Sequence, residues 1–273
     1  MLRRLLHRFG KELTPFPAPP SRDTKALIRV LQHHQIMTVL DVGANVGQYA
    51  KRIRTGGYRE RIVSFEPLSA AHRQLAEAAG FDPKWQVAPR LAIGDTDGRV
   101  TLNVSAESDM SSMLKFRPDW GDMLDSSAFI GEETVDQRRL ATIFDEWVKP
   151  GERTLLKIDT QGYESKVLDG ALPVMDRIHG IQLEMALVEV YEGEPLWRDM
   201  MARIESLGFT LVLLIPGYFN RRTARLIQVD GVFMRASEVM DARKPGFRPL
   251  SYDLPADGTA PEGEKGTDKG AGG

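Results

Sequence analysis

The chain has 273 residues, of which 42% are hydrophobic and 27% charged, as in an ordinary soluble globular protein. The formal net charge of -2 gives no reason to expect nucleic acid binding. The absence of cysteine excludes disulfides, thiolate zinc sites and a cysteine nucleophile. Since no break in composition precedes the C-terminal tail, we expect one domain over residues 21–253.

The two ends of the chain differ in composition from the rest. Residues 1–20 begin with a short basic amphipathic stretch and end in a proline-rich linker. The basic stretch is too short to cross a membrane and lacks the apolar core of a signal peptide, so we expect a cytoplasmic protein. Weak contact of this stretch with an anionic lipid surface stays open. Residues 254–273 have almost nothing to bury, and we expect them to be disordered.

Hydrophobic periodicity predicts that strands and helices alternate between these ends. In chain order we expect a helix from about Ser21, a strand at 38–41, a helix at 46–54, a strand at 62–65, a helix at 70–79 and a strand at 85–93. There follow a strand at 101–104 returning along the preceding one, a strand at 155–159, a helix at 163–168, a strand at 181–187, a helix at 196–207 and a pair of strands at 211–215 and 227–234. This alternation predicts an α/β fold with a mostly parallel sheet and helices on both faces.

The first predicted strand ends in a turn that is typical of α/β sheets that bind nucleotides. Asp41 closes the apolar run, and Gly43 and Gly47 lie in the turn before the next helix. A Cβ atom at either glycine would hold a ligand away from the main chain. A glycine pair also serves ordinary strand-to-helix turns, so the pattern alone leaves that alternative open.

The second predicted strand ends in Glu66, which Pro67 follows. Glu66 lies 19 positions after Gly47, near the spacing at which dinucleotide-binding folds place a carboxylate on the ribose hydroxyls. A carboxylate suits this role because it accepts two hydrogen bonds from a diol. The alternative is that Glu66 caps the following helix.

Each of the four strands expected to be parallel carries an acid toward its end, at Asp41, Glu66, Asp159 and Glu184. Ligands of open α/β sheets bind beyond the carboxyl ends of the strands, so we expect these acids to converge on one cleft. Carboxylates without a basic phosphate clamp suit a ligand with hydroxyls and a positive charge. S-adenosylmethionine has both, whereas a pyrophosphate cofactor fits less well.

Several segments resemble the FkbM-type methyltransferases, a family within the class I S-adenosylmethionine-dependent group. The similar segments are 41–47, 65–67, 92–95, 156–164, 167–171 and 226–233, within a resemblance that spans roughly residues 38–235. The most specific is Lys-Ile-Asp-x-x-Gly-x-Glu, from Lys157 to Glu164. Thr160 and Gln161 stand where many relatives have Val-Glu, which leaves Gln161 uncharged.

The resemblance implies a seven-stranded, Rossmann-like class I methyltransferase sheet with an antiparallel terminal hairpin. It implies that S-adenosylmethionine is the cofactor, with the glycine turn on its methionine part, Glu66 on the ribose, Ala92 and Ile93 near the adenine, and Asp159 beside the transferring methyl group. The cofactor-binding residues expected on this basis are Asp41, Gly43, Ala44, Asn45, Gly47, Glu66, Pro67, Ala92 and Ile93. Because many members methylate sugars or small hydroxylated metabolites, we expect a small-molecule or glycan acceptor.

Methylation of an alcohol requires that its proton be removed, by a base or with the help of a metal. None of the five histidines occupies a position that we can place at the cleft, which leaves Asp159 as the first candidate base, with Glu164 and Glu184 as alternatives. Lys157 shares a strand face with Asp159, so we expect an ion pair that keeps Asp159 ionised. Glu164 could instead be a first-turn acid that stabilises the helix dipole. No metal ligands are predicted, although assistance by a divalent metal stays open.

Two segments are candidates for binding the acceptor. The polar stretch 107–131 contains Ser111 and Ser112, and the basic segment 217–225 contains Arg221, whose charge suggests an anionic acceptor. Either segment could instead be ordinary exposed surface. The leading hypothesis is an O-methyltransferase. The alternatives are an NAD-type oxidoreductase on a similar sheet and a nucleoside-binding protein without catalysis, and the oligomeric state is not predicted.

Overall fold

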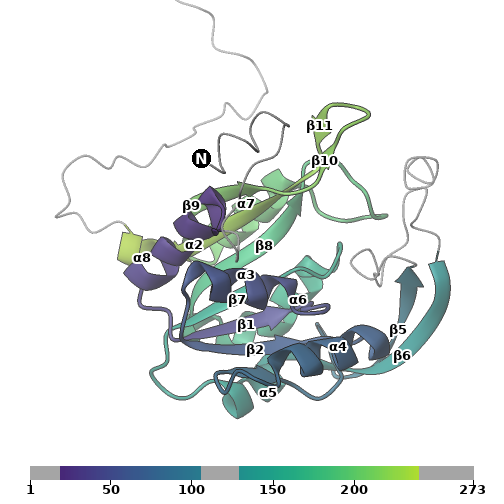
Figure 1. The fold of residues 1–273 in the computed structure, drawn as a ribbon. Helices are drawn as coiled ribbons and strands as arrows, with labels where there is room; N and C mark the ends of the chain where they lie inside the picture. The colour runs from purple at the N-terminus through teal and green to yellow at the C-terminus, as the bar shows by residue number, and fades with distance from the viewer. Residues whose placement is uncertain (1–18, 106–128, 240–273) are drawn as a thin grey trace, which may run out of the picture. The chain divides into compact units, whose positions relative to one another are not determined.

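The computed structural model describes residues 19–105 and 129–239 and contains a central sheet of seven strands (Figure 1). In spatial order these are β3 (Trp85–Val87), β2 (Arg61–Phe65), β1 (Thr38–Val42), β7 (Thr154–Ile158), β8 (Ile178–Ala186), β12 (Gln228–Arg235) and β9 (Phe209–Pro216). Neighbouring strands are parallel except at β12, which is antiparallel to both β8 and β9. The expected seven-stranded, mostly parallel sheet with an antiparallel terminal pair is confirmed.

Helices cover both faces of this sheet, as the sequence predicts. On one face α2 (Arg22–His33), α3 (Gln48–Gly56) and α4 (Ser69–Ala79) pack Leu31, Ile53 and Leu75 against Val39 and Leu155. On the other face lie α5 (Leu140–Trp147), α6 (Glu164–Ala171), a 3-10 helix η3 (Leu172–Arg177) and α7 (Trp197–Ser206). Strand residues therefore alternate between two buried layers, which is why the strands read as continuous apolar runs.

A second sheet of three strands corrects two of the predictions. In it β4 (Ala92–Gly94) runs parallel to β6 (Phe129–Arg139), and β5 (Gly98–Ser105) runs antiparallel to β6. The expected strand at 85–93 is therefore divided between two sheets, and the strand at 101–104 does not return along it. Pro89, which cannot donate to a strand ladder, lies in the segment that separates β3 from β4. Neither β6 nor α5 was predicted from the sequence.

The basic segment between β9 and β12 contains a short hairpin, β10 (Phe219–Asn220) and β11 (Arg225–Leu226). The last described element is α8 (Ala236–Val239). No helix in the described ranges is long and apolar enough to span a membrane. Residues 1–18 and the tail from 240 lie outside the described residues, so the predicted limits of the domain stay predictions.

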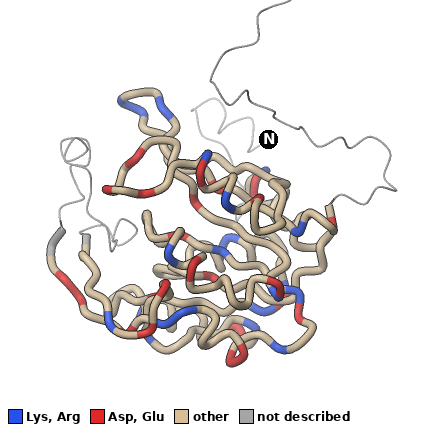
Figure 2. The backbone as a smooth tube through the Cα atoms, turned by 180° about the vertical axis from the view of Figure 1, so that it is seen from behind, with Lys and Arg blue, Asp and Glu red and all other residues tan. Residues whose placement is uncertain are grey.

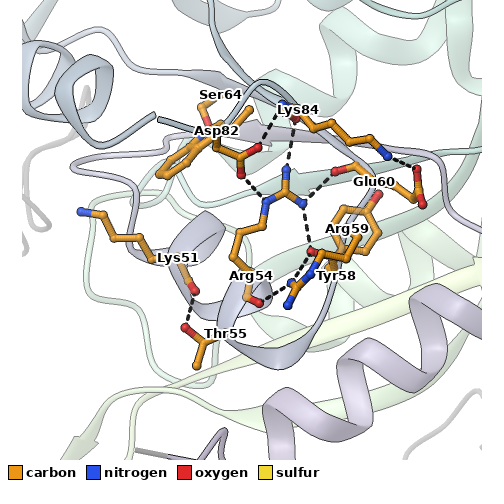
Figure 3. A network of polar contacts seen from close by, with 10 residues as sticks. Lys51, Arg54, Thr55, Tyr58, Arg59, Glu60, Ser64, Asp82 and Lys84 are labelled. Carbon is orange, nitrogen blue, oxygen red and sulfur yellow. Dashed lines mark hydrogen bonds and ion pairs between the residues drawn. The ribbon is translucent and has the colours of Figure 1, made fainter. Parts of the chain in front are cut away.

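Arg54 fixes the C-terminal end of α3 to the loops that lead into β2 and β3 (Figure 3). Its Nε lies 2.6 Å from Oδ2 of Asp82, and its guanidinium also donates to the carbonyls of Tyr58, Glu60 and Lys84 at 3.0, 2.7 and 3.2 Å. With its C-terminal end held in this way, α3 presents its first residues at the carboxyl edge of β1.

Helix α6 approaches the second sheet closely enough to require a glycine. A Cβ atom added to Gly170 would lie 1.9 Å from the carbonyl oxygen of Gly94. Contact at that distance is not tolerated without a shift of the backbone, so the glycine sets the spacing between α6 and β4.

We expect Gly170→Ala to destabilise the protein by about 1–3 kcal/mol, although alanine in place of glycine ordinarily favours a helix by about 1 kcal/mol. Urea unfolding followed by circular dichroism measures the change. Gly80→Ala, at the end of α4, is the matched control, because its Cβ would lie 3.4 Å from the carbonyl of Glu77, an ordinary contact. Equal stability of the two variants would contradict the assigned role of Gly170.

Candidate active site

Four polar residues occupy equivalent positions on four adjacent strands. Asp41 of β1 pairs in register with Ser64 of β2 and with Lys157 of β7, which in turn pairs with Gln182 of β8. Directly paired residues point to the same face of a sheet, so these side chains form a polar row beneath α3. Tyr49 of α3 closes the row, since its hydroxyl donates to Oε1 of Gln182 at 2.8 Å.

The centre of the row is a buried ion pair. Nζ of Lys157 lies 2.9 Å from Oδ1 of Asp41 and 3.6 Å from Oδ2 of Asp159, and it donates to the carbonyl of Gly43 at 3.2 Å. Burial alone would lower the pKa of Lys157, but the charges of Asp41 and Asp159 raise it above its usual value. The predicted ion pair between Lys157 and Asp159 is confirmed. Asp41 is fully buried, and its other oxygen accepts from Ser64 at 3.2 Å.

Asp159 and Glu184 are joined by one neutral side chain. Nε2 of Gln161 donates to Oδ1 of Asp159 at 2.8 Å and to Oε2 of Glu184 at 3.2 Å. The side chain of Asp159 is 38% exposed, which leaves it accessible to a ligand. Gln228 of β12 also donates to Oε2 of Glu184, at 2.8 Å. The two strand ends therefore form one connected acidic group.

Several acidic side chains gather around Glu184. Burial raises the pKa of Glu184 well above its usual value, and the neighbouring acids Asp159 and Glu164 raise it further. Asp230 pairs in register with Glu184, and its pKa is also raised, by burial and by Asp159. The carboxyl edge at β7, β8 and β12 is thus a region in which a positive charge would be stabilised.

Glu66 is buried beside the glycine turn. Its Oε2 accepts from the backbone N–H of Asn45 and its Oε1 from that of Leu68, each at 2.8 Å. Burial raises its pKa to about 7, against the lowering effect of these two bonds. Leu68 is the residue before α4, so Glu66 organises both the turn after β1 and the entry to α4. Each carboxylate oxygen has a second lone pair with which to accept a ligand hydroxyl.

The two glycines of the turn are required by contacts within the protein. Gly43 has φ +73°, and a Cβ there would lie 1.8 Å from the carbonyl oxygen of Asp159. Gly47 has φ +83°, and a Cβ there would lie 2.6 Å from the ring of Trp85. Asn45 between them also has a positive φ, of 47°. These contacts require glycine at both positions, and the expected approach of a ligand to this turn stays a prediction.

Glu164 is buried at the first position of α6. Its Oε1 accepts from the backbone N–H of Thr160 at 2.7 Å and from the Thr160 hydroxyl at 3.2 Å. Burial raises the pKa of Glu164 to about 7. These bonds within its own turn match the first-turn structural role that was considered for Glu164 beside a catalytic one.

The remaining predicted residues belong to other segments of the chain. Ala92 and Ile93 are buried in β4, in the second sheet, and Pro67 follows Glu66 at the end of β2. Arg221 is exposed in the turn between β10 and β11. Ser111 and Ser112 lie outside the described residues.

The sequence interpretation missed Tyr49, Gln182, Tyr191 and Asp230. Gln182 could have been found, because it is a polar residue in an otherwise apolar strand, aligned with Lys157. Tyr191, whose hydroxyl donates to Oε1 of Gln161 at 2.9 Å, lies in the irregular segment after β8, where no sequence periodicity applies.

Neither a metal centre nor a histidine base emerges from the described part of the chain. No group of three or more His, Cys, Asp or Glu residues there could hold a metal ion. His72 contacts the carbonyl of Ala88 at 2.8 Å, and His34 and His179 lie before β1 and at the start of β8, at the opposite edge of the sheet.

The chain is similar in sequence to known methyltransferases. The chain is 27% identical over 187 residues to the 2-O-methyltransferase NoeI of Sinorhizobium fredii (strain NBRC 101917 / NGR234), covering 65% of this chain and 74% of that protein. It is 24% identical to the methyltransferase sdnD of Sordaria araneosa, covering 68% and 80%. A solved 1,6-didemethyltoxoflavin-N1-methyltransferase of Burkholderia thailandensis, with bound S-adenosylhomocysteine, is 10% identical with a TM-score of 0.40, covering 78% and 77%. The model of the methyltransferase FkbM domain matches residues 41–211, and the chain belongs to this family of S-adenosylmethionine-dependent methyltransferases.

Proposed function

We propose that this methyltransferase transfers the methyl group to a hydroxyl oxygen of a sugar, glycan or small hydroxylated metabolite. The observation that carries the proposal is the connected acidic group at the carboxyl edge, in which Gln161 links Asp159 to Glu184. The relative NoeI is a 2-O-methyltransferase, which supports an oxygen acceptor. The NAD-type oxidoreductase is disfavoured by the family to which the chain belongs.

The residues of the glycine turn fit S-adenosylmethionine. Glu66 lies beside the turn with one oxygen on the N–H of Asn45, so a ribose diol at this carboxylate would place the nucleoside next to the backbone of residues 43–47. Further along the edge, Asp159 would lie beside the sulfonium that carries the transferring methyl group. Ala44, Pro67, Ala92 and Ile93 stay as proposed contacts.

We assign removal of the proton from the acceptor hydroxyl to Asp159. Bound S-adenosylmethionine supplies an electrophilic methyl group on a sulfonium. Asp159 is the most suitable base because its side chain is accessible, whereas Glu164 is bonded to its own turn. Glu184 is the alternative base, since burial raises its pKa and a higher pKa makes a carboxylate a stronger base.

We further propose that the β10–β11 hairpin binds an anionic part of the acceptor. Its arginines, Arg221, Arg222 and Arg225, are exposed, and the hairpin appears with blue segments at the upper left of Figure 2. The hairpin begins at the carboxyl edge, because Ile227 accepts from the N–H of Leu187, directly after β8. Ser111 and Ser112 stay as proposed acceptor contacts.

Glu66 gives the cofactor affinity a predictable dependence on pH. Its pKa of about 7 means that it is mostly protonated at pH 6 and mostly ionised at pH 8. Two hydroxyl donors favour the ionised form, so binding releases a proton below pH 7 and the affinity for S-adenosylhomocysteine rises about tenfold from pH 6 to pH 8. Calorimetry at both pH values measures this ratio.

In Glu66→Gln the affinity falls about tenfold at pH 8, and the contribution of Glu66 to the pH dependence is lost. Glu77→Gln, on the exposed face of α4, is the control and keeps the wild-type ratio. A wild-type ratio in Glu66→Gln would contradict the ribose assignment.

Asp159→Asn is expected to lower turnover at least about 100-fold while the affinity for S-adenosylhomocysteine changes by less than about threefold. Turnover is measured as transfer of labelled methyl to a panel of glycans, sugars and phenols. Asp136→Asn, on β6 with a side chain that is 74% exposed, is the control. Full turnover in Asp159→Asn would remove this residue as the base and leave Glu184.

A further inference from the structure

Gln161 occupies a position that connects three parts of the carboxyl edge. It lies between β7 and α6, and its side-chain amide contacts Asp159 after β7 and Glu184 on β8. A primary amide carries two N–H hydrogens, so it can donate one to each carboxylate. Its oxygen accepts from the hydroxyl of Tyr191. Both the nitrogen and the oxygen of the side-chain amide are therefore hydrogen-bonded.

The orientation of this amide is determined by its surroundings. Tyr191 is buried, and burial together with nearby acids raises the pKa of its phenol, so the hydroxyl stays protonated and can donate to Oε1 of Gln161. The backbone N–H groups of Tyr191 and Val190 in turn donate to the carboxylate of Glu194. With Oε1 on the tyrosine, the NH2 group must face the two acids.

The electrostatic surroundings make the neutrality of Gln161 important. The charged groups that face Glu184 are Asp159 after β7, Glu164 on α6, Asp230 on β12 and Glu194 after β8, with Lys157 on the far side of Asp159. A carboxylate in place of the amide would add repulsion and would remove the two N–H donors. A glutamine joins the acids while leaving their total charge unchanged.

We propose that Gln161 is a positioning residue, which holds Asp159 and Glu184 together and sets the negative charge that the site presents to a cationic cofactor. This inference rests on the proposed function, since it concerns the same site. The charge matters because S-adenosylmethionine carries a sulfonium, whereas S-adenosylhomocysteine lacks its methyl group and has a neutral sulfur. The ratio of the two affinities therefore reports charge, and a purely structural role would leave that ratio unchanged.

The first test follows the titration of Glu184 by carboxyl-carbon NMR in the full chain without ligand. Gln161→Asn keeps an amide and tolerates the left-handed backbone at this position, where φ is +54°, but is too short to reach both acids. We expect the pKa of Glu184 to rise by about half a unit in Gln161→Asn and by about one unit or more in Gln161→Glu. The control is Gln32→Glu, exposed on α2, which adds the same charge elsewhere and should leave the pKa of Glu184 unchanged.

The second test measures the affinities for S-adenosylmethionine and S-adenosylhomocysteine at pH 9, where a glutamate at 161 is ionised. In Gln161→Glu the ratio of the affinity for S-adenosylmethionine to that for S-adenosylhomocysteine should be about fivefold higher than in the wild type. In Gln32→Glu this ratio should equal that of the wild type. An unchanged pKa of Glu184 in both Gln161 variants, or an unchanged affinity ratio in Gln161→Glu, would overturn the proposal. If the wild type bound neither ligand, the proposed function would fail, and the titration would still decide the role of Gln161.

Discussion

The buried ion pair between Asp41 and Lys157 is the interaction on which the geometry of the carboxyl edge depends. Both residues lie on central strands that pair in register, and neither charge is exposed to water. Removing two charges from water costs several kcal/mol for each ion, which is offset only when further hydrogen bonds complete their surroundings. Ser64 and the carbonyl of Gly43 supply those bonds, so the pair ties the turn after β1 to the sheet.

The close packing of the turn follows from the same arrangement. Gly43 lies against the backbone of Asp159, and Lys157 contacts both the carbonyl of Gly43 and the carboxylate of Asp159. The end of β1 and the end of β7 are thereby fixed relative to each other. In the proposed function these two ends hold different parts of the reaction, the cofactor at the first and the acceptor hydroxyl at the second, and alignment of the two reactants is the main requirement of methyl transfer.

Some acids at the carboxyl edge are bonded to other groups of the protein, whereas others are accessible to a ligand. Asp41 and Glu164 are engaged with a lysine and with a backbone turn, whereas Asp159 keeps an accessible side chain. All three side chains are carboxylates, and their different surroundings give them different roles. Cofactor binding and proton removal can thus be assigned to different carboxylates of one connected group.

The sequence by itself determined the alternation of elements, the parallel sheet and the set of acids at the strand ends, because apolar runs and chain-local turns carry that information. Even the ion pair of Lys157 with Asp159 followed from two-residue alternation along one strand. Only the tertiary structure decided that β4 and β5 pair with β6, that Gln161 joins Asp159 to Glu184, and that Tyr191 orients its amide. These contacts join residues that lie far apart in the chain or on irregular segments. The periodicity of a single helix or strand does not predict such contacts.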